Sequence, residues 1–156
     1  MEQVSMNKDL KLSEHFTLGE LTKTSLKTED GNIPSRVVIE NLRNLCENWL
    51  EDLRYSYNTL YHKGGVIINS GYRSPEVNRL AGGAPTSNHL TGCAVDIRVG
   101  GFEQAIRYAS ILLDISEGTK RDFDELFIER NKAGSHWIHF AVRPKNNRRK
   151  TGFIMT

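Results

Sequence analysis

Alternating apolar and polar side chains in residues 93–99 constrain the fold more than any other feature of the chain. One set of alternate positions holds Cys93, Val95, Ile97 and Val99, and the other holds Ala94, Asp96 and Arg98. Successive side chains of a β-strand point to opposite faces of a sheet, so the pattern predicts a half-buried strand. Residues 137–142 repeat it, with Ile138, Phe140 and Val142 alternating with Trp137, His139 and Ala141. We expect each strand to carry one polar residue, Asp96 or His139, in the middle of its face away from the core.

The remaining pattern predicts helices beside this sheet. Apolar residues recur at three- and four-residue spacing within residues 35–60, which is typical of an amphipathic helix. The other expected elements are strands at 66–69 and 125–129 and helices at 74–80 and 102–113. Strands and helices do not alternate strictly along the chain. The sequence therefore predicts an α+β fold, with a small antiparallel sheet flanked by helices.

The length of 156 residues is that of one ordinary domain. We expect residues 1–34 to form an arm packed on the domain, residues 35–142 to form its core, and residues 143–156 to form a basic tail. Five of the 21 basic residues fall between Arg143 and Lys150, although the net charge is only +2. A solvated, partly disordered tail is the expected structure there, and a nucleic-acid partner is not expected.

Composition places the chain among globular proteins, with 38% apolar and 26% charged residues. No apolar run approaches the roughly 20 residues that cross a bilayer, and the first residues lack the apolar core of a signal peptide. We expect synthesis in the cytoplasm, no membrane partner and a monomer. Cys46 and Cys93 have no paired Cys-x-x-Cys spacing and are expected to be buried small residues.

A metal site can be assembled from His89, Asp96 and His139. Thr91 and Gly92 allow the chain to turn so that His89 lies over the strand that carries Asp96. Two imidazoles and one carboxylate are an ordinary ligand set for a single catalytic zinc ion, which polarises a carbonyl group and lowers the pKa of bound water toward roughly 7. Each residue alone also has an ordinary explanation: a histidine before a glycine turn is often a loop residue, and a strand aspartate is often an ion-pair partner.

The motif S-x-H-x-x-G-x-A-x-D at residues 87–96, followed by W-I-H at residues 137–139, resembles the zinc D-alanyl-D-alanine carboxypeptidase family. That family includes vancomycin-resistance D,D-dipeptidases and phage L-alanyl-D-glutamate endolysins. The similarity extends to the segments SGYRSPEVNRLAGGAPTS and HFTLGEL, covers about residues 16–142, and is greatest to the short, phage-associated branch. It implies a small zinc-carrying sheet flanked by helices, as in lysostaphin-like peptidases and the hedgehog signalling domain.

The resemblance also implies roles for individual residues. By position, His89, Asp96 and His139 correspond to the zinc ligands. Arg73 corresponds to an arginine that polarises the substrate carbonyl or holds its carboxylate, although a structural ion pair is an alternative. Two further residues are candidates for contact with the substrate, namely Ser87, which also suits a turn-capping hydroxyl, and Trp137.

The general base departs from the family pattern. The family usually has an acid three positions before the last histidine ligand, and this chain has His136 there. Glu129 is a second candidate, because pairing of Glu129 with Trp137 across the turn at 131–134 puts it on the face of His139. A one-residue slip in that pairing moves it to the other face. We place Glu129 slightly ahead of His136.

The expected function is hydrolysis of peptidoglycan stem peptides by a zinc peptidase, as a D,D-carboxypeptidase or an L,D- or D,D-endopeptidase of endolysin type. Such a protein reaches the cell wall as a phage lysin or as part of a virion. The alternative is a binding module that keeps the zinc cleft for wall peptides and has lost hydrolysis, which His136 in the position of the base favours.

Overall fold

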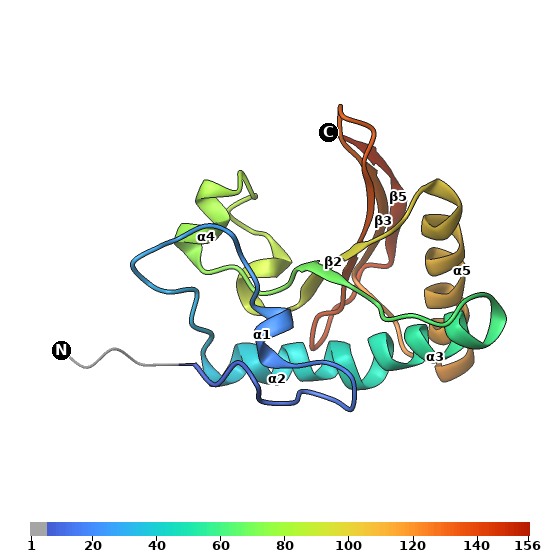
Figure 1. Cartoon of the computed structure of the whole chain (residues 1–156), viewed down its shortest axis with the longest axis horizontal. Coiled ribbons are helices and arrows are strands. Elements are labelled where there is room, and N and C mark those ends of the chain that lie inside the picture. The colour runs from blue at the N-terminus through green and yellow to red at the C-terminus, as the bar shows by residue number, and fades with distance from the viewer. Residues whose placement is uncertain (1–5) are drawn as a thin grey trace.

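The sheet contains five strands within residues 6–156, the part of the chain that the computed structural model describes (Figure 1). The strands are β1 (Ile68–Ser70), β2 (Ala94–Arg98), β3 (Glu125–Arg130), β4 (His136–Ala141) and β5 (Lys150–Met155). Their order across the sheet is β1-β2-β4-β3-β5, and only the β3–β5 pair is parallel. The α+β prediction is confirmed, but the sheet is mixed and not antiparallel throughout.

The helices lie on one face of the sheet and around its ends. They are α1 (Leu18–Leu21), α2 (Arg36–Leu45), α3 (Glu51–Leu60), α4 (Pro75–Leu80) and α5 (Phe102–Thr119). The helix expected at residues 35–60 is confirmed, since a π-helical turn at Cys46–Leu50 joins α2 to α3 and the Ser35 hydroxyl caps α2. Helix α5 continues to Thr119, six residues beyond the predicted end.

The core lies between the sheet and helices α2, α3 and α5. The inward side chains of β2 and β4 include Val95, Ile97, Ile138 and Phe140, which are fully buried. Trp49 joins the two layers, with its ring centroid 5.0 Å from that of Phe140. The predicted core face of both strands is therefore confirmed, and the opposite face is left for polar groups.

The N-terminal segment packs along this core. Phe16 and Leu21 are buried, and Glu51 at the start of α3 accepts hydrogen bonds from the Ser13 hydroxyl at 2.6 Å and the His15 amide at 2.7 Å. Residues 1–5 of the expected arm lie outside the described residues. Within residues 6–156, no helix is both long and apolar enough to cross a membrane.

The C-terminal segment differs from the predicted tail. Residues 150–155 form strand β5, whose register pairs Lys150 with Glu125. The preceding Arg148 binds Asp124 through Nε at 2.9 Å and Nη2 at 2.7 Å, and Arg149 binds Glu117 and Asp122. The prediction of a partly disordered tail is therefore wrong: the segment is largely exposed, but acids distant in sequence neutralise Arg148 and Arg149, and β3 supplies its strand partner.

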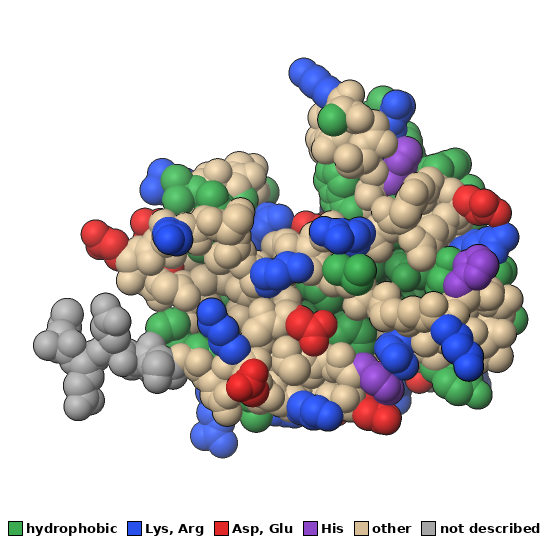
Figure 2. All heavy atoms as spheres, viewed as in Figure 1, with side chains coloured by type: hydrophobic (Ala, Val, Ile, Leu, Met, Phe, Trp, Pro, Cys, Tyr) green, Lys and Arg blue, Asp and Glu red, His purple; other side chains and the backbone are tan. Residues whose placement is uncertain are grey.

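The face of the sheet away from α5 is turned toward α4 and the short 3₁₀ helix η2 (Asn88–Thr91). Figure 2 shows this side of the molecule hollowed between the segment around α4 and the ends of the C-terminal strands. Asp96 of β2, Glu125 and Glu129 of β3 and His139 of β4 lie on this face of the sheet.

Candidate metal centre

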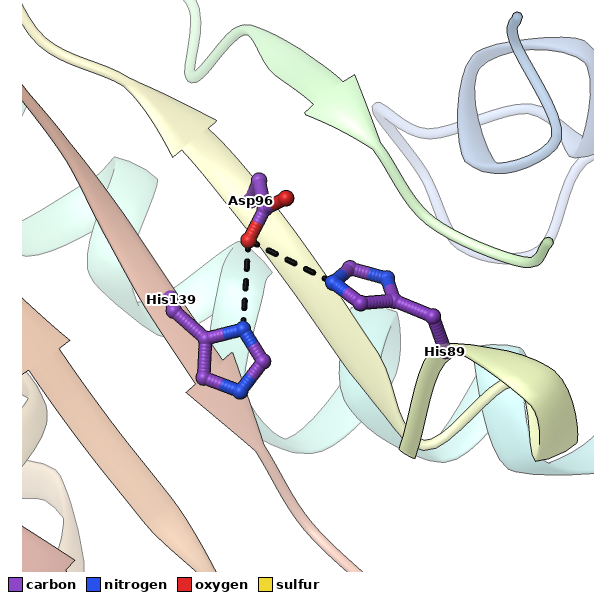
Figure 3. Close-up of side chains that lie close together, drawn as sticks. All are labelled: His89, Asp96 and His139. Carbon is purple, nitrogen blue, oxygen red and sulfur yellow. Dashed lines mark hydrogen bonds and ion pairs between the residues drawn. The ribbon is translucent and has the colours of Figure 1, made fainter. Parts of the chain in front are cut away.

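Three separate elements bring His89, Asp96 and His139 together (Figure 3). His89 lies in η2, Asp96 on β2 and His139 on β4, where Asp96 and His139 are direct partners in the register. One ligand atom of each residue lies within 4.8 Å of the others. The structure thus assembles the group that the sequence singled out.

The turn before β2 positions His89. Gly92 ends η2 with φ of +73°, and a Cβ atom there would lie 2.7 Å from the backbone oxygen of Val38 on α2. Only glycine avoids both the backbone strain and the clash. The Ser87 hydroxyl caps the start of η2 by accepting a hydrogen bond from the His89 amide at 3.1 Å, which is the turn-capping geometry considered for it.

Hydrogen bonds on the far side of each imidazole determine which nitrogen faces Asp96. His89 Nδ1 donates to the carbonyl oxygen of Gly71 at 2.7 Å, so Nε2 presents a lone pair. His139 Nε2 donates to Glu125 Oε1 at 3.1 Å, so Nδ1 is the nitrogen left to bind a metal ion when the ring is neutral. Both of these nitrogens face Asp96 Oδ1, at 3.4 Å from His89 Nε2 and 3.2 Å from His139 Nδ1.

Three electron-rich atoms at such distances repel one another unless a cation or a proton lies between them. Burial alone lowers the pKa of His139, but hydrogen bonds to Asp96 and Glu125 raise it to about 9, so a proton competes with a metal ion for Nδ1. Two imidazole nitrogens and one carboxylate oxygen suit zinc. The residues present therefore fit the metal that the sequence implied.

Arg73 fixes the orientation of the Asp96 carboxylate. Its Nη2 donates to Asp96 Oδ2 at 3.1 Å and its Nε donates to the Ser70 hydroxyl at 3.0 Å. The remaining oxygen, Oδ1, is the one that faces the two histidines. In this structure Arg73 forms the ion pair that was the alternative to direct contact with a substrate.

Glu125 is a residue of this site that the sequence did not single out. It is half-buried, contacts His139, and accepts a hydrogen bond from Asn88 Nδ2 at 2.7 Å. Asn88 also donates to Asp124, which binds Arg148. The register contains a signal for this contact. Glu125 pairs with Ala141, a small residue two positions from His139, so Glu125 and His139 are diagonal neighbours, which can touch.

A cleft of about 760 Å³ opens beside His139, one of the three ligands. Its lining includes His139 and, from β3, Glu125, Phe127 and Glu129, and Ser87 and Asn88 lie on the side of η2. The ring of Phe127 stacks on that of His139 with centroids 5.7 Å apart. A substrate in this cleft therefore lies against His139.

Comparison with protein families identifies the chain. A family model described as peptidase M15 matches residues 14–131. The chain belongs to the peptidase M15 family. Comparison with curated proteins gives no match. The M15 match covers His89 and Asp96 and ends before β4, so pairing of β4 with β2 is what adds His139 to the group.

Membership of the M15 family supports a metallopeptidase, and the His-Asp-His group supplies a place for its metal ion. Such an enzyme needs a proton acceptor near the metal. The expected pairing of Glu129 with Trp137 is confirmed, which puts Glu129 on the face of His139. Burial raises the pKa of Glu129. The charges of His139 and His89 and a hydrogen bond from the Trp137 side chain lower it by less, so this carboxyl is more basic than an exposed one.

His136 lies on the opposite face of the sheet. It shares that face with Ile138 and Phe140, and its ring centroid is 5.5 Å from that of Phe102 on α5. This placement turns the His136 ring away from His139 and favours Glu129 over His136 as the proton acceptor. The physical reason is strand alternation: three positions before His139 is an odd step, which reverses the face.

Proposed function

We propose that the protein is a zinc peptidase that hydrolyses peptidoglycan stem peptides at a bond flanked by D-amino acids. The bond is that of a D,D-carboxypeptidase or of an L,D- or D,D-endopeptidase. The observation that carries the proposal is the convergence of two imidazole nitrogens on Asp96 Oδ1 at the wall of a cleft that also contains Glu129. Membership of the M15 family supports it.

His89, Asp96 and His139 hold the ion. When bound, zinc supplies a Lewis acid for the scissile carbonyl and lowers the pKa of water. Glu129 accepts a proton from the attacking water and delivers it to the leaving amine, a role that its raised pKa favours. Arg73 keeps Asp96 in its ligating orientation. Ser87, on the cleft wall, and Trp137, which pairs with Glu129, are the proposed contacts for the peptide.

Digestion of purified sacculi tests the proposal. Zinc-loaded protein is incubated with sacculi in the presence or absence of a chelator, and the soluble fragments are separated by mass. The expected result is a set of fragments with new amine termini that disappears with chelator and with Glu129→Gln. The fragment masses identify the bond that is cut.

The same experiment separates an enzyme from a binding module. One equivalent of bound zinc, retention on sacculi and no new amine termini would show a wall-peptide binder without hydrolysis. Zinc binding that fails altogether contradicts both functions.

A further inference from the structure

Three cationic side chains line the cleft at the end where β3 and β5 begin: Arg143, Arg148 and Lys150. Arg148 is already neutralised, because two of its nitrogens donate to the two oxygens of Asp124 at 2.9 and 2.7 Å. Its position is therefore fixed by the protein itself. The other two cations differ in this respect.

Arg143 and Lys150 retain charge that the protein does not neutralise by a close contact. Arg143 Nη1 lies 3.9 Å from Asp124 Oδ1, beyond hydrogen-bond distance, and that oxygen already accepts from Arg148 Nε and from the Arg148 amide. Among residues 6–156, Lys150 has no carboxylate within 4.0 Å. Both side chains are partly or fully exposed in the cleft, so they attract an anion that enters it.

The register gives the separation of this charge from the metal ligands. Lys150 pairs with Glu125, and Gly152 pairs with Phe127, the partner of His139. Lys150 therefore lies on the same face as His139, two strands across and two residues along, which is about 12 Å between Cα atoms. An extended peptide advances about 3.3 Å per residue, and the lysine side chain shortens the gap, so two or three substrate residues span it.

We propose that Arg143 and Lys150 form an anion subsite that selects peptides with a carboxylate two or three residues from the scissile bond. The inference rests on the proposed function. Arg73 is paired with Asp96, and Arg98, on the face of Asp96, is not part of the cleft lining, so Arg143 and Lys150 are the cations of the cleft that can receive a substrate carboxylate.

Paired peptides test the subsite. Once the sacculus digestion has identified the bond, a synthetic stem peptide with free carboxylates is compared with the same peptide amidated two and three residues from that bond. The proteins are the zinc-loaded wild type, Arg143→Gln, Lys150→Gln and Lys145→Gln, the last being an exposed cation outside the cleft lining. If the protein binds wall peptides without cutting them, the same pairs are compared by equilibrium binding.

We expect Arg143→Gln and Lys150→Gln each to lower kcat/KM for the acidic peptide by about fivefold through KM, the upper end for an exposed ion pair. Neither substitution should change kcat/KM for the amidated peptide. Lys145→Gln should have the wild-type kcat/KM for both peptides. Equal use of both peptides by the wild type overturns the subsite while leaving the peptidase intact. Failure to cut or bind either peptide overturns both the subsite and the peptidase. A preference for the acidic peptide that appears in binding, without hydrolysis, supports the subsite and rejects the peptidase.

Discussion

Glu125 Oε1 lies 3.1 Å from His139 Nε2, on the side of the ring away from Asp96. A carboxylate in this position fixes the imidazole orientation and raises the basicity of the nitrogen that faces the ligand group. Because Glu125 also accepts from Asn88, and Asn88 donates to Asp124, the metal centre is connected to the segment that carries Arg148.

Substitution of Glu125 should weaken metal binding. We expect Glu125→Ala to lower zinc affinity about 10- to 100-fold, because His139 loses its orienting partner. Glu125→Gln should have a smaller effect, since its side-chain oxygen still accepts the hydrogen bond. Competition with a chromophoric chelator measures both, with the partly exposed Glu76→Ala on α4 as the control. Wild-type affinity in Glu125→Ala would show that Glu125 does not orient the ligand.

Substitution of Glu129 should separate chemistry from metal binding. Glu129→Gln keeps the size of the side chain and removes the proton acceptor, so we expect full zinc content and a loss of about 10²- to 10⁴-fold in peptide hydrolysis. His136→Gln should retain near wild-type turnover because its side chain lies against Phe102. Metal analysis and a peptide assay on both variants check this. The reverse outcome would make His136 the base.

Asp124→Asn should loosen strand β5. The buried Asp124 carboxylate accepts from Asn88 and from three nitrogens of Arg148, and an amide replaces one acceptor with a donor. We expect faster hydrogen exchange of the amides in residues 150–155, with those of α2 unchanged. The exposed Asp114→Asn on α5 is the matched control. Unchanged exchange in Asp124→Asn would mean that backbone pairing alone holds the strand.

Glu51 should make stability depend on pH in the acid range. Burial alone would raise the pKa of Glu51, but hydrogen bonds from Ser13 and His15 lower it below its ordinary value of 4.5. A lowered folded-state pKa gives stabilisation that is present above pH 4.5 and is lost as the pH falls through the folded-state pKa. We expect Glu51→Gln to reduce the free energy of unfolding by about 2 kcal/mol at neutral pH.

Urea unfolding of wild type and Glu51→Gln at neutral pH and at an acid pH below the folded-state pKa measures this difference. The gap between the two proteins should shrink at the acid pH. An equal gap at both pH values would assign the effect of Glu51 to packing.

Strand alternation was enough to predict the ligand face of β2 and β4, since a period of two needs no knowledge of the partner strand. The turn at residues 131–134 suggested the register of Glu129 with Trp137, with a one-residue slip as the alternative. The contact of Glu125 with His139 was not predicted because it is diagonal across two strands and depends on the small Ala141. Strand β5 was missed because the charges at residues 143–150 suggested a solvated segment, and their acidic partners lie on α5 and at the start of β3.

The position of β5 also bears on the order in which the cleft is made during protein synthesis. Residues 89 and 96 leave the ribosome well before residues 148–150, and the growing chain has β2 and β3 before the strand that borders the far end of the cleft. A nascent chain that contains His139 but not yet Lys150 has its three ligands and lacks one wall of the substrate site. All three ligands are therefore translated before the cations of the proposed anion subsite.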